Sequence, residues 1–278
     1  MVNTVILSYI TFIYFFCFLA YLVMLVTGRQ VFGRTGTYLT IAGFIGHTLG
    51  ICFRWYESHK LGIGHAPLSN LYESLIFFSW AIILLYLIVE KRTRSRTAGA
   101  FVTPIAFLSL AYASFSENVT DSIQPLIPAL QSNWLTAHVI TCFFGYAAFA
   151  LSFGMSIMYF IKMSETPDKR SVVLYLIPEL NILDDLNYQM VMIGFLLLTL
   201  GIITGSVWAH TAWGSYWSWD PKETWSLVTW LVYALMLHAR LMRGWQGKRL
   251  AIVSVAGFFC VLFTYFGVNY LESLHAYF

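Results

Sequence analysis

Tryptophan is concentrated in one stretch of this chain. Six of the ten tryptophans lie between Trp208 and Trp230, in the sequence WAHTAWGSYWSWDPKETWSLVTW, together with Asp220, Lys222 and Glu223. One or two such rings usually anchor a helix at the membrane–water interface. Six of them predict a flat aromatic platform, on which a wide planar apolar ligand such as a porphyrin would stack with its charged edge facing water.

Histidine is the second residue type here that could do chemistry, because imidazole is a common ligand of metal ions and of haem iron. His138 lies at the start of one apolar segment, and His275 lies just beyond the end of the last one. His47 and His238 lie within apolar segments, where an unpaired imidazole is costly to bury and a titratable group is a functional candidate. The alternative for each is an ordinary histidine that faces water or bonds to a nearby carbonyl.

The composition predicts the elements that would position these side chains. The chain has 278 residues, 59% of them hydrophobic and 10% charged, with a mean hydropathy of +0.70, as is typical of an all-α polytopic membrane helix bundle. Eight apolar segments are long enough, or nearly so, to cross a hydrocarbon core of roughly 30 Å as helices. We place these transmembrane helices at Val5 to Val26, Thr37 to Trp55, Leu71 to Val89, Ala98 to Phe115, Leu135 to Ile161, Tyr188 to Trp208, Thr224 to Leu241 and Leu250 to Tyr270.

Basic residues in alternate loops predict the orientation. Short cytoplasmic loops are enriched in Lys and Arg, so we expect both termini and the tryptophan stretch on the outer side. The net charge of +3 follows from this pattern and gives no support to nucleic-acid binding. The basic loops hold Arg29 and Arg34; Lys91, Arg92, Arg94 and Arg96; Lys162, Lys169 and Arg170; and Arg240, Arg243, Lys248 and Arg249.

The chain reads as one unit. No tandem repeat or interior linker divides it, so we expect a single integral membrane domain over residues 1–278, with residues 208–230 as an external loop. The inner connector from Lys162 to Asn187 is expected to include a short surface helix. The four cysteines lie in or at the edges of apolar segments and form no C-x-x-C pair, so thiol–disulfide exchange is not expected.

The tryptophan stretch also resembles a known motif. WGSYWSWDPKE is similar to the WWD signature of haem-handling membrane proteins, and WDPKETWSL is most similar to the CcsA (ResC) family of system II cytochrome c maturation. The resemblance implies that His138 and His275 are the axial ligands of a haem iron on the outer face, and that His238 binds haem within the bilayer. It implies haem b, as substrate or ligand, on a platform of Trp208, Trp213, Gly214, Trp217, Trp219, Asp220, Lys222, Glu223 and Trp225.

What the resemblance implies about activity is covalent attachment of haem to the C-x-x-C-H segment of an apocytochrome c. The site would lie on the outer face of a bacterial inner membrane or a thylakoid membrane, and thiol-reducing proteins would contribute indirectly. The helical rise places His47 about 10 Å shallower than His238, so one haem between them is not expected. The second transmembrane ligand would then come from a separate CcsB-like (ResB-like) membrane subunit, while His47 stays in the candidate haem-binding set.

Several of these residues have structural alternatives. Asp220, Pro221 and Glu223 have the spacing of a helix N-terminus, while Gly214 would let a flat ligand approach the backbone. Lys222, with Arg54 second, is a candidate partner for a haem propionate, and His210 either bonds a propionate or faces water.

A second segment, GHAPLSNLYESLIFFSW, follows His59 and also resembles part of the family. It begins beside His65 and centres on Pro67, Asn70 and Glu73, whose role is either specific to the family or ordinary turn and helix-cap chemistry.

Two other functions remain as alternatives. A haem transporter or chaperone of the system I type would use the same platform without attaching haem to protein. A proton- or quinone-linked membrane subunit would instead use His47, His238 and Glu73 as a proton path, and would leave the tryptophan stretch unexplained.

Overall fold

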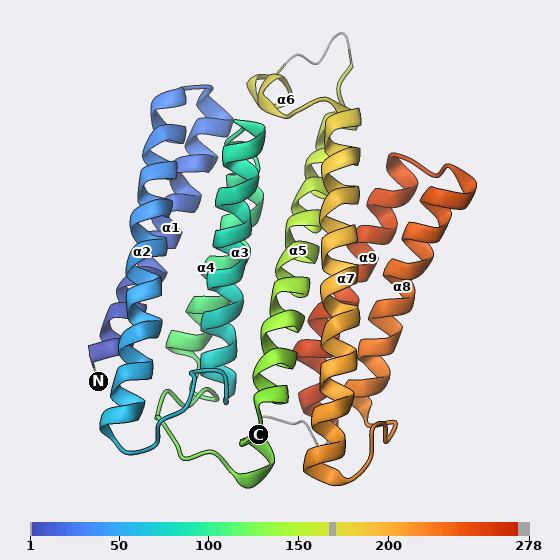
Figure 1. The fold of residues 1–278 in the computed structure, drawn as a ribbon. Helices are drawn as coiled ribbons and strands as arrows, with labels where there is room; N and C mark the ends of the chain where they lie inside the picture. Colours follow the sequence, from blue (N-terminus) through green and yellow to red (C-terminus); the bar gives the residue numbers. More distant parts are fainter. Residues whose placement is uncertain (1, 167–170, 272–278) are drawn as a thin grey trace. The chain divides into compact units, whose positions relative to one another are not determined.

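The structure, a computed structural model, describes residues 2–166 and 171–271 (Figure 1). The described residues form α-helices and short 3-10 turns and contain no β-strand, which confirms the all-α fold. The helices are α1 (Val2–Thr27), α2 (Gln30–Lys60), α3 (Leu71–Thr93), α4 (Gly99–Phe115), α5 (Asn133–Met163), α6 (Val172–Leu176), α7 (Leu180–Trp213), α8 (Pro221–Arg243) and α9 (Lys248–Tyr265), with 3-10 turns η1 (Pro128–Leu130) and η2 (Gly267–Tyr270).

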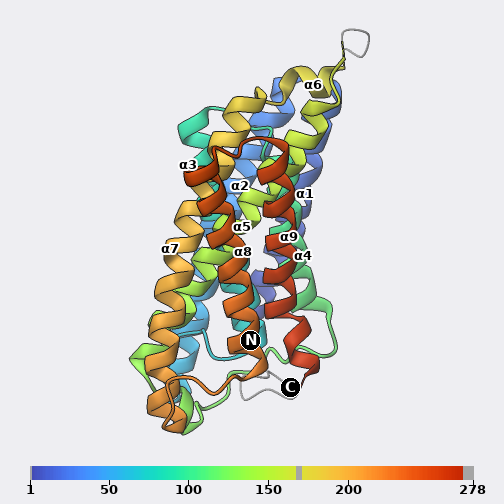
Figure 2. The same cartoon turned by 90° about the vertical axis from the view of Figure 1, so that its right-hand side faces the viewer.

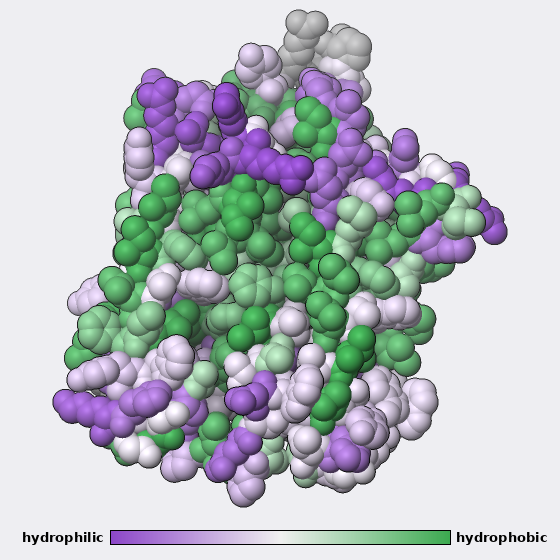
Figure 3. Space-filling view, viewed as in Figure 1, coloured by the Kyte–Doolittle hydropathy of each residue, from purple (hydrophilic) through white to green (hydrophobic). Residues whose placement is uncertain are grey.

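All eight predicted spans are present as helices, and α6 is the short helix expected in the inner connector. Seven helices in the described ranges are long and apolar enough to cross a membrane, and α4 is a shorter apolar helix of 17 residues. The protein is therefore an integral membrane protein. Figure 3 shows apolar side chains over the middle of the helices and hydrophilic ones near their ends.

Some helix boundaries differ from the sequence-based ones. α2 runs from Gln30 to Lys60, longer at both ends than expected, and α7 begins at Leu180 rather than Tyr188. α9 ends at Tyr265, because the chain tightens into η2 instead of continuing as an α-helix to Tyr270.

The helices gather into two compact units. The first comprises Met1–Pro125 and Phe160–Leu180, and the second comprises Leu126–Tyr159 and Asn181–Phe278. The single membrane domain expected over residues 1–278 stays a prediction.

Glycines let α1 and α2 pack closely in the first unit. A Cβ added at Gly36, Gly43 or Gly50 would lie within 2.9 Å of a side-chain atom of α1. These glycines recur every seven residues, so they lie on one face of α2, and small residues of this kind allow membrane helices to approach closely. The side chains that fill the seam are Tyr21, Tyr14 and Leu7.

A buried ion pair joins α2 to α3 in the same unit. The Nε atom of Arg54 lies 2.8 Å from Oε1 of Glu73, and both side chains are 1% exposed. The other carboxylate oxygen of Glu73 accepts hydrogen bonds from the backbone N–H and hydroxyl of Ser69. Asn70 caps α3 by accepting from the Glu73 N–H at 2.9 Å. Cap chemistry therefore accounts for Asn70 and Glu73, and the enclosed Arg54 gives no support to pairing with a haem propionate.

The second unit is held by contacts of α5, α7, α8 and α9. α8 and α9 run side by side (Figure 2). The Tyr233 ring of α8 stacks flat on Phe149 of α5, with ring centroids 3.6 Å apart. Arg240, near the end of α8, donates to Asp184 and Asp185, near the start of α7, at 2.5 and 2.9 Å. These bonds tie the two helix ends together.

Candidate functional site

The tryptophan stretch consists of two helix ends and a short loop between them. α7 continues to Trp213 and α8 begins at Pro221, so the external loop predicted over residues 208–230 is limited to residues 214–220. Gly214 ends α7 with φ +77°, a conformation that favours glycine, and a Cβ there would meet nothing within 4 Å. The six rings are divided between α7 (Trp208, Trp213), the loop (Trp217, Trp219) and α8 (Trp225, Trp230).

The acidic residues at the start of α8 form a capping box. The Asp220 side chain accepts from the Lys222 N–H at 3.0 Å. The carboxylate of Glu223 reaches back to the N–H groups of Asp220 and Ser218, at 3.3 and 2.8 Å. Helix capping therefore accounts for Asp220 and Glu223, and it fixes the loop that carries the rings.

Three aromatic rings between Trp213 and Trp219 are exposed. Trp219 is 68% exposed, Tyr216 is 57% exposed and Trp213 is 37% exposed. Trp219 also has φ +59°, which is uncommon for a bulky residue and costs of order 1–3 kcal/mol. The Trp219 ring is thus held exposed by a strained backbone conformation. Such strain occurs mainly at functional sites.

Trp217 contributes a polar group to the same loop. Its ring lies edge-on to Trp219, with centroids 5.7 Å apart. The indole N–H of Trp217 is buried and has no hydrogen-bond partner among the residues that the structure describes. Exposed rings beside an unpaired donor fit a planar apolar ligand that also carries acceptor groups, as a porphyrin with propionates does.

One of the tryptophans assigned to the platform is buried, and another packs against a neighbouring helix. Trp208 is 5% exposed, and its indole N–H donates to the Ala129 carbonyl at 2.8 Å. Its ring lies edge-on to Trp213, with centroids 4.9 Å apart. Trp225 packs against Phe263, at 4.2 Å. Trp208 thus supports the exposed rings from behind, because its hydrogen bond and burial turn it away from the surface.

His138 lies beside Trp208 in a fixed orientation. The two rings are stacked, with centroids 5.9 Å apart and planes 22° apart. Nδ1 of His138 lies 2.7 Å from the Gly201 carbonyl of α7. A carbonyl only accepts hydrogen bonds, so Nδ1 carries the proton and Nε2 is the nitrogen whose lone pair can bind a metal. Histidines that ligate metals are typically oriented by a bond of this kind.

Glycine makes room for the His138 ring. A Cβ at Gly205 would lie 2.5 Å from Nδ1 of His138, and one at Gly201 would lie 2.5 Å from Sγ of Cys142. The Lys222 ammonium interacts electrostatically with Asp220 and with the Cys142 thiol. Lys222, in the first turn of α8, therefore lies at the same end of the second unit as His138.

The structure places the other histidines as follows. His238, on α8, is exposed in the second unit. His47, on α2 of the first unit, is fully buried with Nδ1 3.1 Å from the Tyr14 hydroxyl. His210 is exposed and stacks on Tyr216, with centroids 4.1 Å apart. His275 lies outside the described residues, so its predicted ligation is an expectation only.

Some residues at or near the site were missed by the sequence analysis. Gly201 and Gly205, which orient His138, form a G-x-x-x-G pattern that signals close helix packing in apolar segments and could have been noticed. Tyr216 and the His47 partner Tyr14 had no comparable signal, since a single tyrosine near an apolar segment is ordinary.

The described residues form an all-helical integral membrane protein. The end of the second unit around residues 213–220 has an exposed aromatic face, and the oriented His138 lies at the same end. The comparisons then place the protein in a family. Residues 68–275 match the cytochrome C assembly protein family. The chain belongs to this family, and within it to the CcsA-type cytochrome c biogenesis proteins.

The relatives that carry this name cover most of the chain. The cytochrome c biogenesis protein CcsA of Prochlorococcus marinus (strain NATL1A) is 45% identical over 83% of this chain and 80% of its own length. The protein of the same name from Pyropia yezoensis is 39% identical over 88% of this chain and 87% of its own. The one from Chlamydomonas reinhardtii is 44% identical over 81% of this chain, which spans 63% of that longer protein.

A solved structure shares the fold. The cytochrome c haem lyase CcmF superposes with a TM-score of 0.71 over 95% of this chain, at 15% sequence identity. This chain spans less than half of it, 46%. At this identity the match shows a common helical architecture.

Proposed function

We propose that this protein holds haem on the outer side of the membrane and presents it for covalent attachment to apocytochrome c, together with a CcsB-like membrane subunit. The observation that carries the proposal is His138, whose Nδ1 bond to the Gly201 carbonyl orients Nε2 as a metal ligand beside the tryptophan face. Membership of a cytochrome c assembly family supports the same reading.

The residues of this chain would bind and orient haem. His138 supplies one axial ligand, and His275 is assigned as the other by the family resemblance alone. The exposed rings of Trp213 and Trp219 cover one porphyrin face, with Tyr216 beside them. The Trp217 N–H and the Lys222 ammonium are the candidate donors for the propionates, because one has no partner within the described residues and the other is cationic.

The route across the membrane is assigned to α8. His238 lies in the last turns of this helix, opposite the end that begins at the tryptophan loop, and its side chain is exposed. With the basic loops on the cytoplasmic side, haem enters past His238 and leaves at the platform. A second transmembrane ligand from the CcsB-like subunit completes this entry site.

The attachment step adds each cysteine thiol of the C-x-x-C-H segment across one haem vinyl group. A carbon–sulfur bond forms at one vinyl carbon, the thiol hydrogen ends on the other, and the double bond becomes a single bond without a net change of oxidation state. No acid or base of this chain is assigned to this step. Its contribution is orientation and the exclusion of water.

The test is co-expression with a CcsB-like subunit and an apocytochrome c, followed by measurement of covalent haem and of the absorption spectrum of the purified complex. We expect covalent cytochrome from the wild type, and loss of the external haem signal in His138→Ala and in His275→Ala. A Soret band without covalent product would leave haem transport as the function. Absence of a Soret band from the wild-type complex would overturn haem handling altogether.

The proton-path alternative loses support from the first unit. Glu73, one of its three proposed members, is held by Arg54 and Ser69 in a buried ion pair and helix cap. The exposed tryptophan face is explained by haem binding and not by proton transfer.

A further inference from the structure

The indole N–H of Trp208 bonds to a part of the chain far away in the sequence. Trp208 lies near the end of α7, and its Nε1 donates to the backbone carbonyl of Ala129, in η1, at 2.8 Å. Both residues belong to the second unit, so the bond lies within one compact body. Because Trp208 is only 5% exposed, water does not readily replace the carbonyl, and the bond limits how far the indole can turn.

The turn that offers this carbonyl is itself braced. Pro128 begins η1, and its carbonyl accepts the backbone N–H of Gln131 at 3.1 Å. The side-chain amide of Gln131 donates to the carbonyl of Leu126 at 2.9 Å. α5, the helix that carries His138, begins shortly after this turn. The Ala129 carbonyl is therefore a held acceptor close to the start of the helix that carries the candidate ligand.

The Trp208 ring also limits the orientation of His138. Nδ1 of His138 donates to the Gly201 carbonyl at 2.7 Å, but one hydrogen bond still lets the imidazole plane tilt about the N–H···O axis. The flat face of Trp208 lies against that plane, with ring centroids 5.9 Å apart and planes 22° apart. A tilt of the imidazole would bring its edge against the indole. The hydrogen bond and the stacked ring together set the direction of the Nε2 lone pair.

We propose that Trp208 is a positioning residue for the external haem site, which acts through His138 and does not itself cover the porphyrin. The bond to Ala129 holds the indole, and the indole holds the plane in which Nε2 of His138 faces the iron. Groups that orient a metal ligand from behind in this way affect metal affinity without touching the metal. The inference rests on the proposed haem-binding function.

The test uses the full complex with its partner subunit and the variant Trp208→Phe. This change keeps a ring against His138 and removes the N–H that binds Ala129. We expect haem titration of the purified complex to show an affinity about tenfold lower, as loss of an outer partner of a metal ligand does. In the His138→Ala background, with imidazole added, the same change should alter the affinity by less than about twofold, because the side chain through which Trp208 acts is gone.

Two controls separate positioning from general damage. Trp80→Phe removes an indole N–H that donates to the Thr48 hydroxyl at 2.9 Å in the first unit, so it is the chemically matched change. Thr229→Val removes a buried hydroxyl that lies 3.0 Å from the hydroxyl of Thr264, and it loosens α8 against α9 in the second unit. Both variants should bind haem as the wild type does, although Thr229→Val should unfold at a lower temperature.

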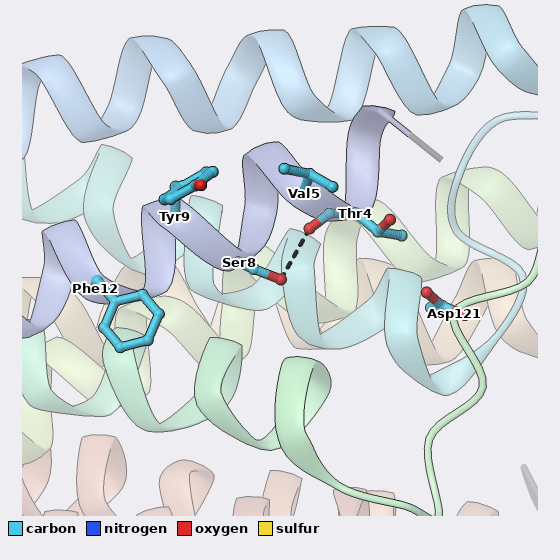
Figure 4. Close-up of a pocket in the computed structure, with 6 residues that line it drawn as sticks. All are labelled: Thr4, Val5, Ser8, Tyr9, Phe12 and Asp121. Atoms are coloured by element: carbon cyan, nitrogen blue, oxygen red, sulfur yellow. Dashed lines mark hydrogen bonds between the residues drawn. The ribbon is translucent and has the colours of Figure 1, made fainter.

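A groove along α1 in the first unit is a rival place for a flat apolar ligand (Figure 4). No histidine lines it; the lining residues are Thr4, Val5, Ser8, Tyr9, Phe12 and Asp121. Phe12→Ala removes an exposed ring from this groove and should leave haem affinity unchanged. A loss of affinity in Phe12→Ala, with wild-type affinity in Trp208→Phe, would place haem in the groove and overturn the inference.

The remaining outcomes separate this inference from the proposed function. A wild-type complex without a Soret band overturns the function. A normal wild-type spectrum overturns the positioning role if affinity is unchanged in Trp208→Phe, or if the loss is equally large in the His138→Ala background. If Trp208→Phe does not accumulate in the membrane, Gln131→Ala replaces it, because this exposed change loosens η1. Its affinity should fall below that of the wild type, and an unchanged affinity overturns the role.

Discussion

Two buried or half-buried histidines, one in each unit, show how different surroundings prepare the same side chain for different tasks. His47 of the first unit is fully enclosed, and its Nδ1 faces the Tyr14 hydroxyl, which can donate or accept. His138 of the second unit is only partly buried, and its Nδ1 faces the Gly201 carbonyl, which can only accept. Only at His138 does the partner itself determine which nitrogen carries the proton.

The comparison teaches that burial alone does not identify a ligand histidine. His47 is fully enclosed, so no surface where a ligand could arrive adjoins it in the first unit. His138 has an oriented ring, a stacking neighbour and an exposed aromatic face at the same helix ends. A histidine whose ring is oriented by a backbone carbonyl, next to a surface where a ligand can arrive, is a better ligand candidate than a histidine that is only buried.

The largest effect is expected from His138→Ala. Removing the ligand should reduce external haem by more than the roughly 10- to 100-fold loss typical of an outer-shell change, and added imidazole should restore part of it. The Soret band of the purified complex, with and without imidazole, measures this. His59→Ala is the control, since that exposed ring bonds the Trp55 carbonyl in the first unit. A wild-type spectrum in His138→Ala would show that His138 is no more a haem ligand than His47.

A smaller loss of haem affinity is expected from Gly205→Ala, which tests whether the α7 surface must leave room for the His138 ring. The new methyl group would lie 2.5 Å from the His138 ring, so the ring must shift, at a cost of about 1–3 kcal/mol for overpacking. Haem titration of the complex should show weaker binding with the protein still folded. Ser206→Ala, one residue further along the same helix, is the control. Equal affinity in both variants would mean that the position of His138 does not matter.

Tyr14→Phe tests the first unit. Without the hydroxyl, the buried Nδ1 of His47 loses its partner, which should lower the free energy of unfolding by about 1–3 kcal/mol. Thermal unfolding in detergent measures the change. The external haem spectrum should stay as in the wild type. A spectral change instead would show that the two histidines are linked.

The smallest effect concerns Trp219. Trp219→Ala removes an exposed ring and should weaken haem binding by about 0.5–1.5 kcal/mol, since stacking contributes that much beyond burial. Trp219→Gly should lose as much binding while relieving the strain of φ +59°, so it should unfold at a higher temperature than Trp219→Ala. Identical melting of the two variants would argue that the backbone there is unstrained.

The sequence predicted the helices well because membrane spans need long apolar runs. All eight predicted segments and the short helix of the inner connector are helical, and seven of the described helices are long and apolar enough to cross a membrane. It assigned residues 208–230 to an external loop, of which residues 214–220 lie outside the helices, because indole rings are common both in helix ends and in interfacial loops. The capping box at Asp220 was the local signal that α8 begins there.

The site itself was only partly predictable. Residue type and motif singled out His138 and the tryptophans, but not which rings would be exposed. Trp208 is hidden by its bond to Ala129, a contact between residues far apart in the sequence, and no local pattern announces it. In the same way Arg54 was taken for a candidate partner of a haem propionate, because its partner Glu73 lies on a different helix.

The short helix α4 has a consequence for the surrounding lipid. Its 17 residues span about 25 Å, roughly 5 Å less than a typical hydrocarbon core. Phe115 at its end is 61% exposed, so this end is not covered by the rest of the first unit. A span this short is accommodated by local thinning of the bilayer, by flanking side chains that reach the interface or by association with other helices, each at a cost of a fraction of a kcal/mol per Å. Hydrophobic mismatch of this kind would favour membranes of lesser thickness.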